Sequence, residues 1–307
     1  MQPSYLELYN SGRLEKCAEA LYERLADCTL CPHQCRTDRI NGRQGKCRSG
    51  VAPVISSFSA HFGEEAPLVG RHGSGTIFFT NCNLACIFCQ NYDISHLGRG
   101  EEISFEELAE AMIQLQKRGC HNINFVTPTH MNYAIVKALL VAVPGGLRLP
   151  LVYNSGGYDA VDILSILEGV YDIYMPDFKY MNSETARDLS GAPDYPERAM
   201  AAITEMHRQV GDLATDRNGV ALRGLLVRHL VLPSNIAATD RVINFIANLS
   251  RDTYINIMDQ YRPEYRANEC FNLKRGITLQ EYDDAVNHAL RCGLTRIDGI
   301  RRQTNWK

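Results

Sequence analysis

The stretch TIFFTNCNLACIFCQ, residues 76–90, joins a run of β-branched and aromatic residues to three closely spaced cysteines. The run TIFFT (76–80) predicts a buried β-strand, because such residues favour an extended, half-buried backbone. Cys82, Cys86 and Cys89 follow directly, in the spacing CxxxCxxC. Folds built from alternating strands and helices place their chemistry at the carboxyl ends of the strands. The stretch therefore predicts a strand that delivers three thiols to such an edge.

From residue 76 onward, apolar β-type runs alternate with amphipathic helical windows. The first helical window, 104–119, opens with Ser104 and Glu107, the sequence pattern of a capping box. Five further strands are expected at 122–126, 149–154, 171–178, 225–232 and 253–260. Six strand-then-helix units predict an α/β protein with a parallel sheet covered by helices. A closed eight-unit barrel usually needs about 250 residues, so we expect an open, partial (β/α)6 barrel over residues 76–300.

Residues 1–75 do not continue this alternation. We expect a helix at about 3–25, a cysteine-rich metal-binding segment and a short strand near 52–63. The chain is thus divided into an N-terminal extension (1–75), the barrel and a short basic tail, RRQTNWK (301–307). The tail is more typical of a solvated terminus than of a nucleic-acid contact.

The composition narrows the class of protein. The chain has 307 residues, of which 45% are hydrophobic, enough for a large buried core. A net charge of −3 gives no general attraction to nucleic acid or to anionic membranes. The sequence shows neither a secretory signal nor an apolar run long enough to span a membrane. Eleven cysteines in such a chain predict a reducing, cytoplasmic location, where thiols bind metals or react more often than they form disulfides.

Three cysteines suit a metal centre that keeps one position open. A structural zinc ion takes four protein ligands, and an ordinary [4Fe–4S] cluster takes four cysteines. Thiolates of Cys82, Cys86 and Cys89 would hold three irons of a [4Fe–4S] cluster and leave the fourth iron free. The spacing therefore predicts a cluster that reacts.

This motif after a first strand resembles that of the radical S-adenosylmethionine (SAM) enzymes. Further segments are similar to an uncharacterised iron–sulfur subgroup related to the pyruvate formate-lyase activating enzymes: NFVTPTH, LPLVYNSGGYD, IYMPDFKY, APDYPERA, RHLVLPSN and NIMDQYRPEY. The resemblance covers residues 25–295. It implies that the cluster binds the methionine part of SAM and cleaves SAM reductively, giving a 5′-deoxyadenosyl radical that abstracts hydrogen from a substrate.

The resemblance also implies SAM contacts at the next two strand ends. Related activating enzymes carry a Gly-Gly-Glu segment after the second strand, where this chain has VTPTH (126–130). Thr127 and Thr129 would offer hydroxyl and backbone groups there in place of the carboxylate. Asn154 and Ser155 precede two glycines after the third strand and suit a ribose or methionine contact. A plain turn would explain the glycines equally.

Charged residues follow the fourth strand and lie within the fifth. Asp177 and Lys179 are two positions apart and should share one face of a strand. Their segment resembles an Asp-x-Lys motif, which implies that Lys179 binds the SAM carboxylate with Asp177 beside it, as the catalytic pair. A buried salt bridge is the alternative. The resemblance makes Arg228 a second carboxylate partner, for which its planar fork is suited, whereas His229 should face the opposite side and contact a helix.

Two more positions are candidate cofactor contacts. Phe88, between two cysteines, would shield the cluster or the adenine, or would simply pack into the mouth of the barrel. Gln260 follows the sixth strand, where relatives carry a histidine near the adenine, and could replace it by hydrogen bonding.

The N-terminal segment holds a second group of cysteines in the spacing C-x2-C-x3-C-x11-C: Cys28, Cys31, Cys35 and Cys47. Four ligands allow a closed site. A structural zinc ion is one interpretation, an electron-relaying second [4Fe–4S] cluster is another, and unligated thiols are the third.

Three functions are compatible with these residues. The first is an enzyme that makes a glycyl radical on a partner protein, and the second is a radical SAM enzyme acting on a small molecule or a macromolecule. Both need a reductant such as flavodoxin or ferredoxin, and the first needs a glycyl radical enzyme or another protein substrate as its partner. The third is an iron–sulfur electron-transfer protein without turnover, which does not explain Asp177, Lys179 and Arg228 at neighbouring strand ends.

Overall fold

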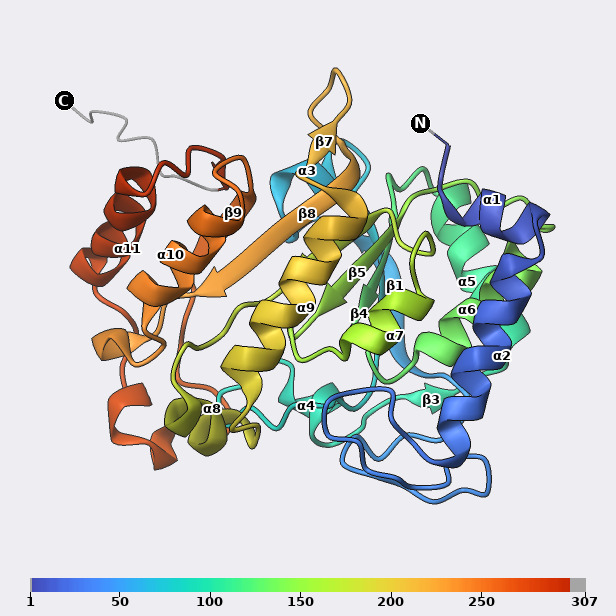
Figure 1. Ribbon diagram of the computed structural model, residues 1–307, viewed down its shortest axis with the longest axis horizontal. Helices are drawn as coiled ribbons and strands as arrows, with labels where there is room; N and C mark the ends of the chain where they lie inside the picture. Colours follow the sequence, from blue (N-terminus) through green and yellow to red (C-terminus); the bar gives the residue numbers. More distant parts are fainter. Residues whose placement is uncertain (1, 299–307) are drawn as a thin grey trace.

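The computed structural model describes residues 2–298 as an α/β fold around one curved, mostly parallel sheet (Figure 1). Six parallel strands are neighbours in chain order: β2 (Ser74–Phe79), β4 (Ile123–Val126), β5 (Leu151–Ser155), β6 (Ile173–Pro176), β8 (Ala221–Leu230) and β9 (Tyr254–Met258). This order confirms the expected succession of strand-then-helix units. Within the described residues the sheet ends at β3 (Glu101–Glu102) and β10 (Ile297–Asp298), so the barrel is open.

Helices follow the parallel strands and cover the sheet: α5 (Phe105–Lys117), α6 (Asn132–Ala142), α7 (Val161–Ile166), α8 (Ser183–Ser190), α9 (Tyr195–Val210), α10 (Thr239–Leu249) and α11 (Leu279–Arg291). Helix α5 begins with the predicted capping box, in which Ser104 and Glu107 each accept the other's backbone N–H. Short 3₁₀ turns lie at Pro233–Asn235, Ala267–Glu269 and Phe271–Leu273. A hairpin precedes the long part of β8, because β7 (Ala214–Thr215) pairs antiparallel with the start of β8.

On β6 and β8 the inward face of the strand changes from apolar to polar toward the carboxyl end. On β6 and just beyond it, Ile173 and Met175 are buried in a small apolar cluster, whereas Asp177 and Lys179 line a cavity. Leu226 and Arg228 repeat this order on β8. Because side chains two apart share a face, these two strands are anchored in the core at one end and carry polar groups at the carboxyl end.

The amino-terminal side of this sheet is closed by a short helix, α3 (Ala66–Val69). Leu68 of α3 is fully buried in the apolar cluster inside the sheet. Figure 1 places α3 on the side of the sheet opposite α4 (Tyr92–Ser95), which follows the three-cysteine loop. The plug at one end leaves the carboxyl ends of the strands as the open side.

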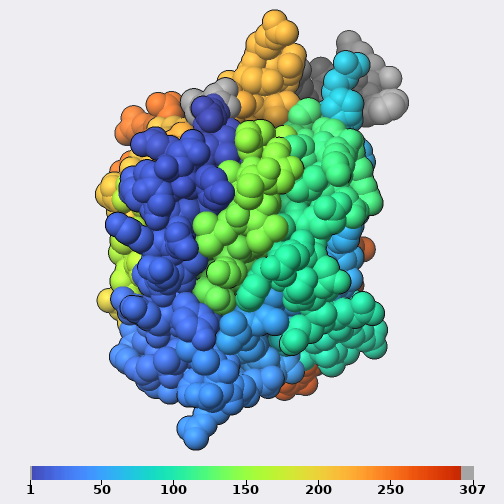
Figure 2. Space-filling model, turned by 90° about the vertical axis from the view of Figure 1, so that its right-hand side faces the viewer, coloured from blue at the N-terminus to red at the C-terminus, as the bar shows by residue number. Residues whose placement is uncertain are grey.

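The N-terminal residues pack on the same core. The expected helix at about 3–25 is interrupted: α1 (Tyr5–Asn10) and α2 (Arg13–Ala26) are separated at Gly12, whose φ of 71° is left-handed and suits glycine. The expected short strand is β1 (Val54–His61), which pairs antiparallel with β2. Helix α2 contacts α6 and α7, and Figure 2 shows this dark blue region beside the green helices with the lighter blue cysteine-rich segment below. The division of the chain at residue 75 stays a prediction.

No helix within residues 2–298 is long and apolar enough to cross a membrane. The basic tail at 301–307, predicted as a solvated terminus, lies outside the described residues, as do the last two positions of the range 76–300.

Candidate active site

A cavity of about 260 Å³ lies at the carboxyl ends of the six parallel strands. Every one of these strands, or the residues directly after it, contributes to its wall: Phe79, Val126, Thr127, Asn154, Ser155, Asp177, Lys179, Arg228, Leu230, Met258 and Gln260. The volume is close to the lower end of the range for small-molecule sites, roughly 300–1,000 Å³. The cavity is therefore large enough for part or all of a small cofactor.

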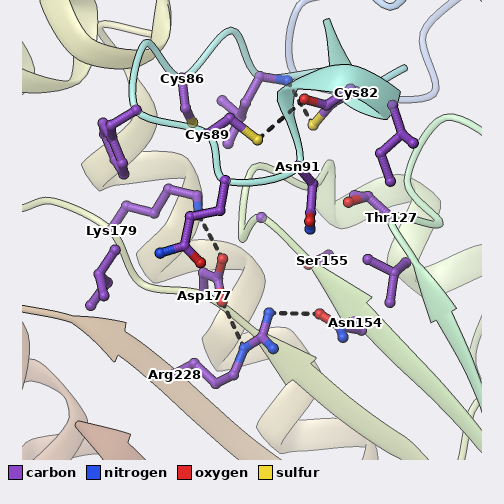
Figure 3. A pocket seen from close by; sticks show the side chains of 18 of the residues that line it. Cys82, Cys86, Cys89, Asn91, Thr127, Asn154, Ser155, Asp177, Lys179 and Arg228 are labelled. Atoms are coloured by element: carbon purple, nitrogen blue, oxygen red, sulfur yellow. Dashed lines mark hydrogen bonds and ion pairs between the residues drawn. The ribbon is translucent and has the colours of Figure 1, made fainter. Parts of the chain in front are cut away.

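The three-cysteine loop, residues 80–96, forms the opposite wall of this cavity (Figure 3). Cys82, Cys86 and Cys89 all line it. The Cys82 Sγ accepts the backbone N–H of Leu84 at 3.3 Å. The Sγ atoms of the other two lie 2.9 Å from the Ser190 hydroxyl and 3.2 Å from the Ser95 hydroxyl, respectively. The sequence prediction that one loop delivers three thiols to the strand ends is met by this geometry.

A chain of charged contacts crosses the floor of the cavity (Figure 3). The Lys179 Nζ lies 2.5 Å from Asp177 Oδ2, and Arg228 Nε donates to Asp177 Oδ1 at 2.8 Å. Arg228 Nη2 also donates to Asn154 Oδ1 at 2.7 Å. The three charged side chains are only 16–19% exposed. The sequence placed Asp177, Lys179 and Arg228 at neighbouring strand ends, and the fold brings them into contact.

Burial and pairing act in opposite directions on these groups. Burial alone would raise the pKa of Asp177, but the charges of Arg228 and Lys179 outweigh it and hold that pKa below its usual range. Burial alone would lower the pKa of Lys179, but Asp177 and the nearby Cys86 outweigh it and raise that pKa. All three side chains are therefore charged at neutral pH, and the two cations exceed the one carboxylate between them.

Cys82 and Cys86 behave differently, because the effect of burial prevails at these two thiols. Burial is the largest influence on Cys82 and the charge of the neighbouring Cys86 is the second; together they raise the pKa of Cys82 to about 12. Burial also raises the pKa of Cys86, although the charge of Lys179 opposes this. Cys82 and Cys86 are consequently protonated at neutral pH, and a metal that binds them must displace their protons.

The other predicted contacts divide into two groups. Thr127, Asn154, Ser155 and Gln260 line the cavity, and so does Phe88. The Phe88 ring also packs edge-on against the rings of Tyr180 and Tyr261, at 6.4 and 6.0 Å between centroids. It thus has both the position to shield a bound group and the packing role that was its alternative.

Thr129 is not brought into the cavity. It is 1% exposed, and its hydroxyl donates to Asp159 Oδ1 at 2.7 Å, within a buried network. His229 faces away from the cavity, as the alternation along the strand predicts. Its ring nitrogens contact the Phe178 carbonyl at 2.6 Å and the Thr239 hydroxyl at 2.9 Å, joining β8 to α10.

Sequence reasoning missed several residues of this site. Glu64 and Glu65 lie 3.7 and 3.8 Å from Arg228, and Glu65 Oε1 also accepts from Asn256 at 3.0 Å. These acids precede the first parallel strand, and no local pattern connects them with β8. Asn91 also lines the cavity beside the three cysteines. The sequence could have predicted this residue, because a polar residue two positions after Cys89 lies on the same loop.

The four N-terminal cysteines gather at a separate, much smaller cavity of about 10 Å³. Cys28, Cys31, Cys35 and Cys47 all line it. As the side chains stand, no set of three or more Cys, His, Asp or Glu residues between 2 and 298 is in metal-coordinating geometry, in this segment or in the three-cysteine loop. The structure therefore brings both predicted groups together without fixing a coordination sphere.

Comparison with known proteins assigns the fold to a family. The model of the radical SAM superfamily matches residues 76–225. Uncharacterized protein MJ0674 of Methanocaldococcus jannaschii is 32% identical over 302 residues, which is 95% of this chain and 82% of that protein. The chain belongs to the radical SAM superfamily. The radical SAM match begins in β2 and ends in β8, so it includes the three-cysteine loop, Asp177 and Lys179. The closer relationship to the pyruvate formate-lyase activating enzymes stays a prediction.

Membership of the radical SAM superfamily implies a [4Fe–4S] cluster and SAM, and the residues fit both. Three thiols face one cavity, and no fourth cysteine of the described residues lines it, so one iron would remain open. The hydroxyls of Ser190 and Ser95 and the Leu84 N–H already contact the sulfur atoms, in the way that outer hydrogen bonds support metal ligands. Lys179 and Arg228 supply positive charge for a carboxylate at the same wall.

Proposed function

We propose that this protein is a radical SAM enzyme that cleaves SAM reductively and uses the product to abstract hydrogen from a substrate. The convergence of six strand ends on one three-thiol loop is the observation that carries this proposal. When bound, the cluster supplies the electron that breaks SAM into methionine and a 5′-deoxyadenosyl radical, which takes hydrogen from the substrate. Every other part of the proposal concerns what the side chains of this chain do.

Lys179 and Arg228 bind the methionine carboxylate of SAM in this proposal. Both are held by Asp177, which fixes their position without cancelling their combined charge. Lys179 is also close enough to Cys86 for each to affect the pKa of the other, so a carboxylate on Lys179 would lie next to the thiol loop. Asp177 acts here as the group that orients the two cations, a role that its two short contacts support.

The amino group of SAM needs a different partner from the Gly-Gly-Glu segment of related enzymes. Thr127 lies at the corresponding strand end and lines the cavity, whereas Thr129 is committed to Asp159. Asn154 Oδ1 is engaged by Arg228, and the Ser155 hydroxyl donates to Asp159 Oδ2 at 2.6 Å. We therefore assign the amino-group contact to the oxygens of Thr127. Phe88 and Gln260, on the far side, border the space left for the adenine.

The central test is cleavage of SAM by protein reconstituted with iron and sulfide under anaerobic conditions and reduced with dithionite. Wild type should release 5′-deoxyadenosine, and Cys86→Ala should lose iron and abolish release, because two thiols cannot hold the cluster. Cys292→Ala, which changes a cysteine outside both cysteine groups, is the matched control and should behave as wild type. Cleavage that survives in Cys86→Ala would refute the assignment, and a wild-type protein that takes up and passes on electrons without cleaving SAM would favour the electron-transfer alternative.

A second test addresses the carboxylate. Lys179→Met should weaken SAM binding about 10- to 100-fold, because a charge-assisted contact in a largely buried site is lost. Iron content and the visible spectrum of the cluster should stay as in wild type. Unchanged SAM affinity would remove Lys179 from the SAM contact and leave it as a structural ion pair.

The substrate class can be decided by tracing hydrogen. Reduced enzyme and SAM are incubated with an extract of cells grown in deuterated medium, separated into dialysable and non-dialysable fractions. Deuterium appearing in 5′-deoxyadenosine with the non-dialysable fraction supports a protein or other macromolecule, including a glycyl radical enzyme. Label from the dialysable fraction supports a small molecule and contradicts the glycyl-radical alternative.

A further inference from the structure

The segment between α2 and β1 forms a second cysteine site away from the strand ends. It is the blue loop region beside β3 and α4 in Figure 1. Besides the four cysteines, the small cavity here is lined by Thr37, Arg39, Gly45 and His130. Cys28, Cys31 and Cys47 are only 7–8% exposed. Three of the four thiols are therefore largely enclosed by protein.

Arg39 is a buried cation without a carboxylate among the described residues. Its side chain is 3% exposed. Its Nε and Nη2 donate to the Gly50 carbonyl, and Nη2 also donates to the His130 carbonyl at 3.0 Å. Its Nη1 has no hydrogen-bond partner within the described part of the chain, and neither has Thr37 Oγ1 at the same cavity. A buried cation of this kind is costly unless an anionic group faces it.

We propose that Cys28, Cys31, Cys35 and Cys47 hold one structural zinc ion, with Arg39 as the buried counter-charge to the metal–thiolate centre. Binding is a proton exchange: one Zn²⁺ replaces the protons of four thiols, which leave as four H⁺. The resulting centre carries a net charge of −2, which is opposite in sign to the single positive charge of Arg39 that faces it. The free Nη1 of Arg39 and the free hydroxyl of Thr37 are donors for its sulfur atoms.

Backbone geometry already supports two of these sulfur atoms. The His33 N–H contacts the Cys31 thiol, and the Lys46 N–H donates to Cys35 Sγ at 3.3 Å. Gly45 makes the second contact possible, because a Cβ at that position would lie 2.8 Å from Cys35 Cβ. Hydrogen bonds from N–H groups to ligand sulfur are the outer contacts that orient metal ligands.

The dimensions of the cavity favour a single ion over a second cluster. Its volume of about 10 Å³ approaches that of one water-sized probe, whereas four irons and four sulfides would require the walls to move apart. Four ligands and no adjacent open cavity match a closed, tetrahedral site. Coordination requires the thiols to rotate about their Cα–Cβ bonds, since the side chains as they stand do not form a coordination set.

The experiment measures zinc and iron in the full-length protein, purified anaerobically from cells supplied with both metals. Wild type should contain about one zinc per chain. The triple variant Cys82→Ala, Cys86→Ala, Cys89→Ala should keep that zinc and lose its iron, whereas the double variant Cys35→Ser, Cys47→Ser should lose the zinc. Iron and sulfide remaining in the triple variant, zinc remaining in the double variant, or wild type that binds no zinc would each overturn the proposal.

The Arg39 contact is tested without removing a ligand, so that misfolding of a cysteine variant does not decide the matter. Arg39→Met should lower zinc affinity about tenfold in competition with a chelator, within the range usual for outer contacts of metal ligands. Arg39→Lys keeps the charge and should recover part of the loss. Cobalt-substituted wild type should show the visible bands of a tetrahedral thiolate site. Equal affinity in wild type and both Arg39 variants would refute the counter-charge, and a cobalt spectrum without thiolate bands would refute the site.

Discussion

The two cysteine groups of this chain differ in what surrounds the sulfur atoms. The three-cysteine loop borders a cavity of about 260 Å³, with Asp177, Lys179 and Arg228 on the facing wall. The four-cysteine segment encloses about 10 Å³, with Arg39 as the charged side chain that lines it. One group therefore has room for a further ligand, and the other does not. Cysteine number and accessible space together separate a reactive centre from a structural one.

The charged side chains around the two cysteine groups also differ, in whether carboxylates pair with them. At the open site the cations are already paired with Asp177, and Glu64 and Glu65 lie within 4 Å of Arg228. At the closed site Arg39 contacts only backbone carbonyls among the described residues. The cations of the open site are thus held by carboxylates before any ligand binds, which suits a cofactor that must enter and leave. In the zinc site that we propose, the unpaired charge of Arg39 would face a negative metal–thiolate centre, which suits an ion that stays bound.

The largest effect is expected when the charge balance of the open site is broken. Asp177→Asn leaves Lys179 and Arg228 facing each other without the carboxylate between them, and should lower the free energy of unfolding by about 3 kcal/mol, as for other buried pairs that lose one partner. Urea denaturation of the full-length protein measures this. The control is Asp188→Asn, which removes an exposed partner of Arg187 and should cost less than about 0.5 kcal/mol. Equal losses in the two variants would show that the open site is not charge-balanced by Asp177.

The sequence predicted the local part of both sites well. The thiol spacing, the position of Asp177 two residues before Lys179, and the capping box at Ser104 are all properties of short segments. Arg228 came from resemblance, and its contact with Asp177 then follows from the parallel pairing of their strands. In each case a repeating backbone geometry converts sequence distance into spatial distance.

What the sequence could not give are contacts between segments far apart. Glu65 reaches Arg228 only because α3 plugs the sheet from the other end. Arg39 is buried by the carbonyls of Gly50 and His130, the second of which lies 91 positions away. The helix expected at about 3–25 was interrupted at Gly12 because a single left-handed residue ends one helix and begins another. Thr129 carried the right functional group, but a buried carboxylate, Asp159, takes its hydroxyl.

A second prediction separates acid effects on the fold from acid effects on the metals. Acid protonates thiolate ligands at both cysteine groups, but burial also lowers the pKa of His229 to about 4, although the Phe178 carbonyl opposes this. Because the folded pKa lies below the ordinary value of about 6.5, neutral His229 contributes stability that is complete above pH 6.5 and is lost as the pH falls toward 4. The loss should approach about 3 kcal/mol for a fully buried ring.

Urea midpoints between pH 7 and pH 4.5 test this. His229→Gln should be less stable at pH 7 and should show a flatter decline with acid. The matched control is Thr239→Val, which removes the hydroxyl contact of the ring but keeps the titrating imidazole and therefore the wild-type slope. If His229→Gln declines as steeply as wild type, acid instability arises elsewhere, either at His130, whose pKa burial also lowers to about 4, or through metal loss from the two cysteine groups.

The smallest expected effect addresses whether the two cysteine groups are independent. His33, inside the four-cysteine segment, donates from Nε2 to the Asn83 carbonyl at 2.7 Å, next to Cys82, and its ring contacts Tyr158 at 5.0 Å between centroids. His33→Ala removes one buried hydrogen bond and should cost about 1 kcal/mol.

Because that bond holds the start of the three-cysteine loop, iron incorporation during reconstitution should also be slowed a few-fold, while zinc content is unchanged. His33→Gln can restore a donor to Asn83 and should recover most of the rate, and His288→Ala, which removes a hydrogen-bonded histidine remote from both groups, should leave the rate as in wild type. If His33→Ala incorporates iron at the wild-type rate, the four-cysteine segment does not support the three-cysteine loop, and the two cysteine groups function independently.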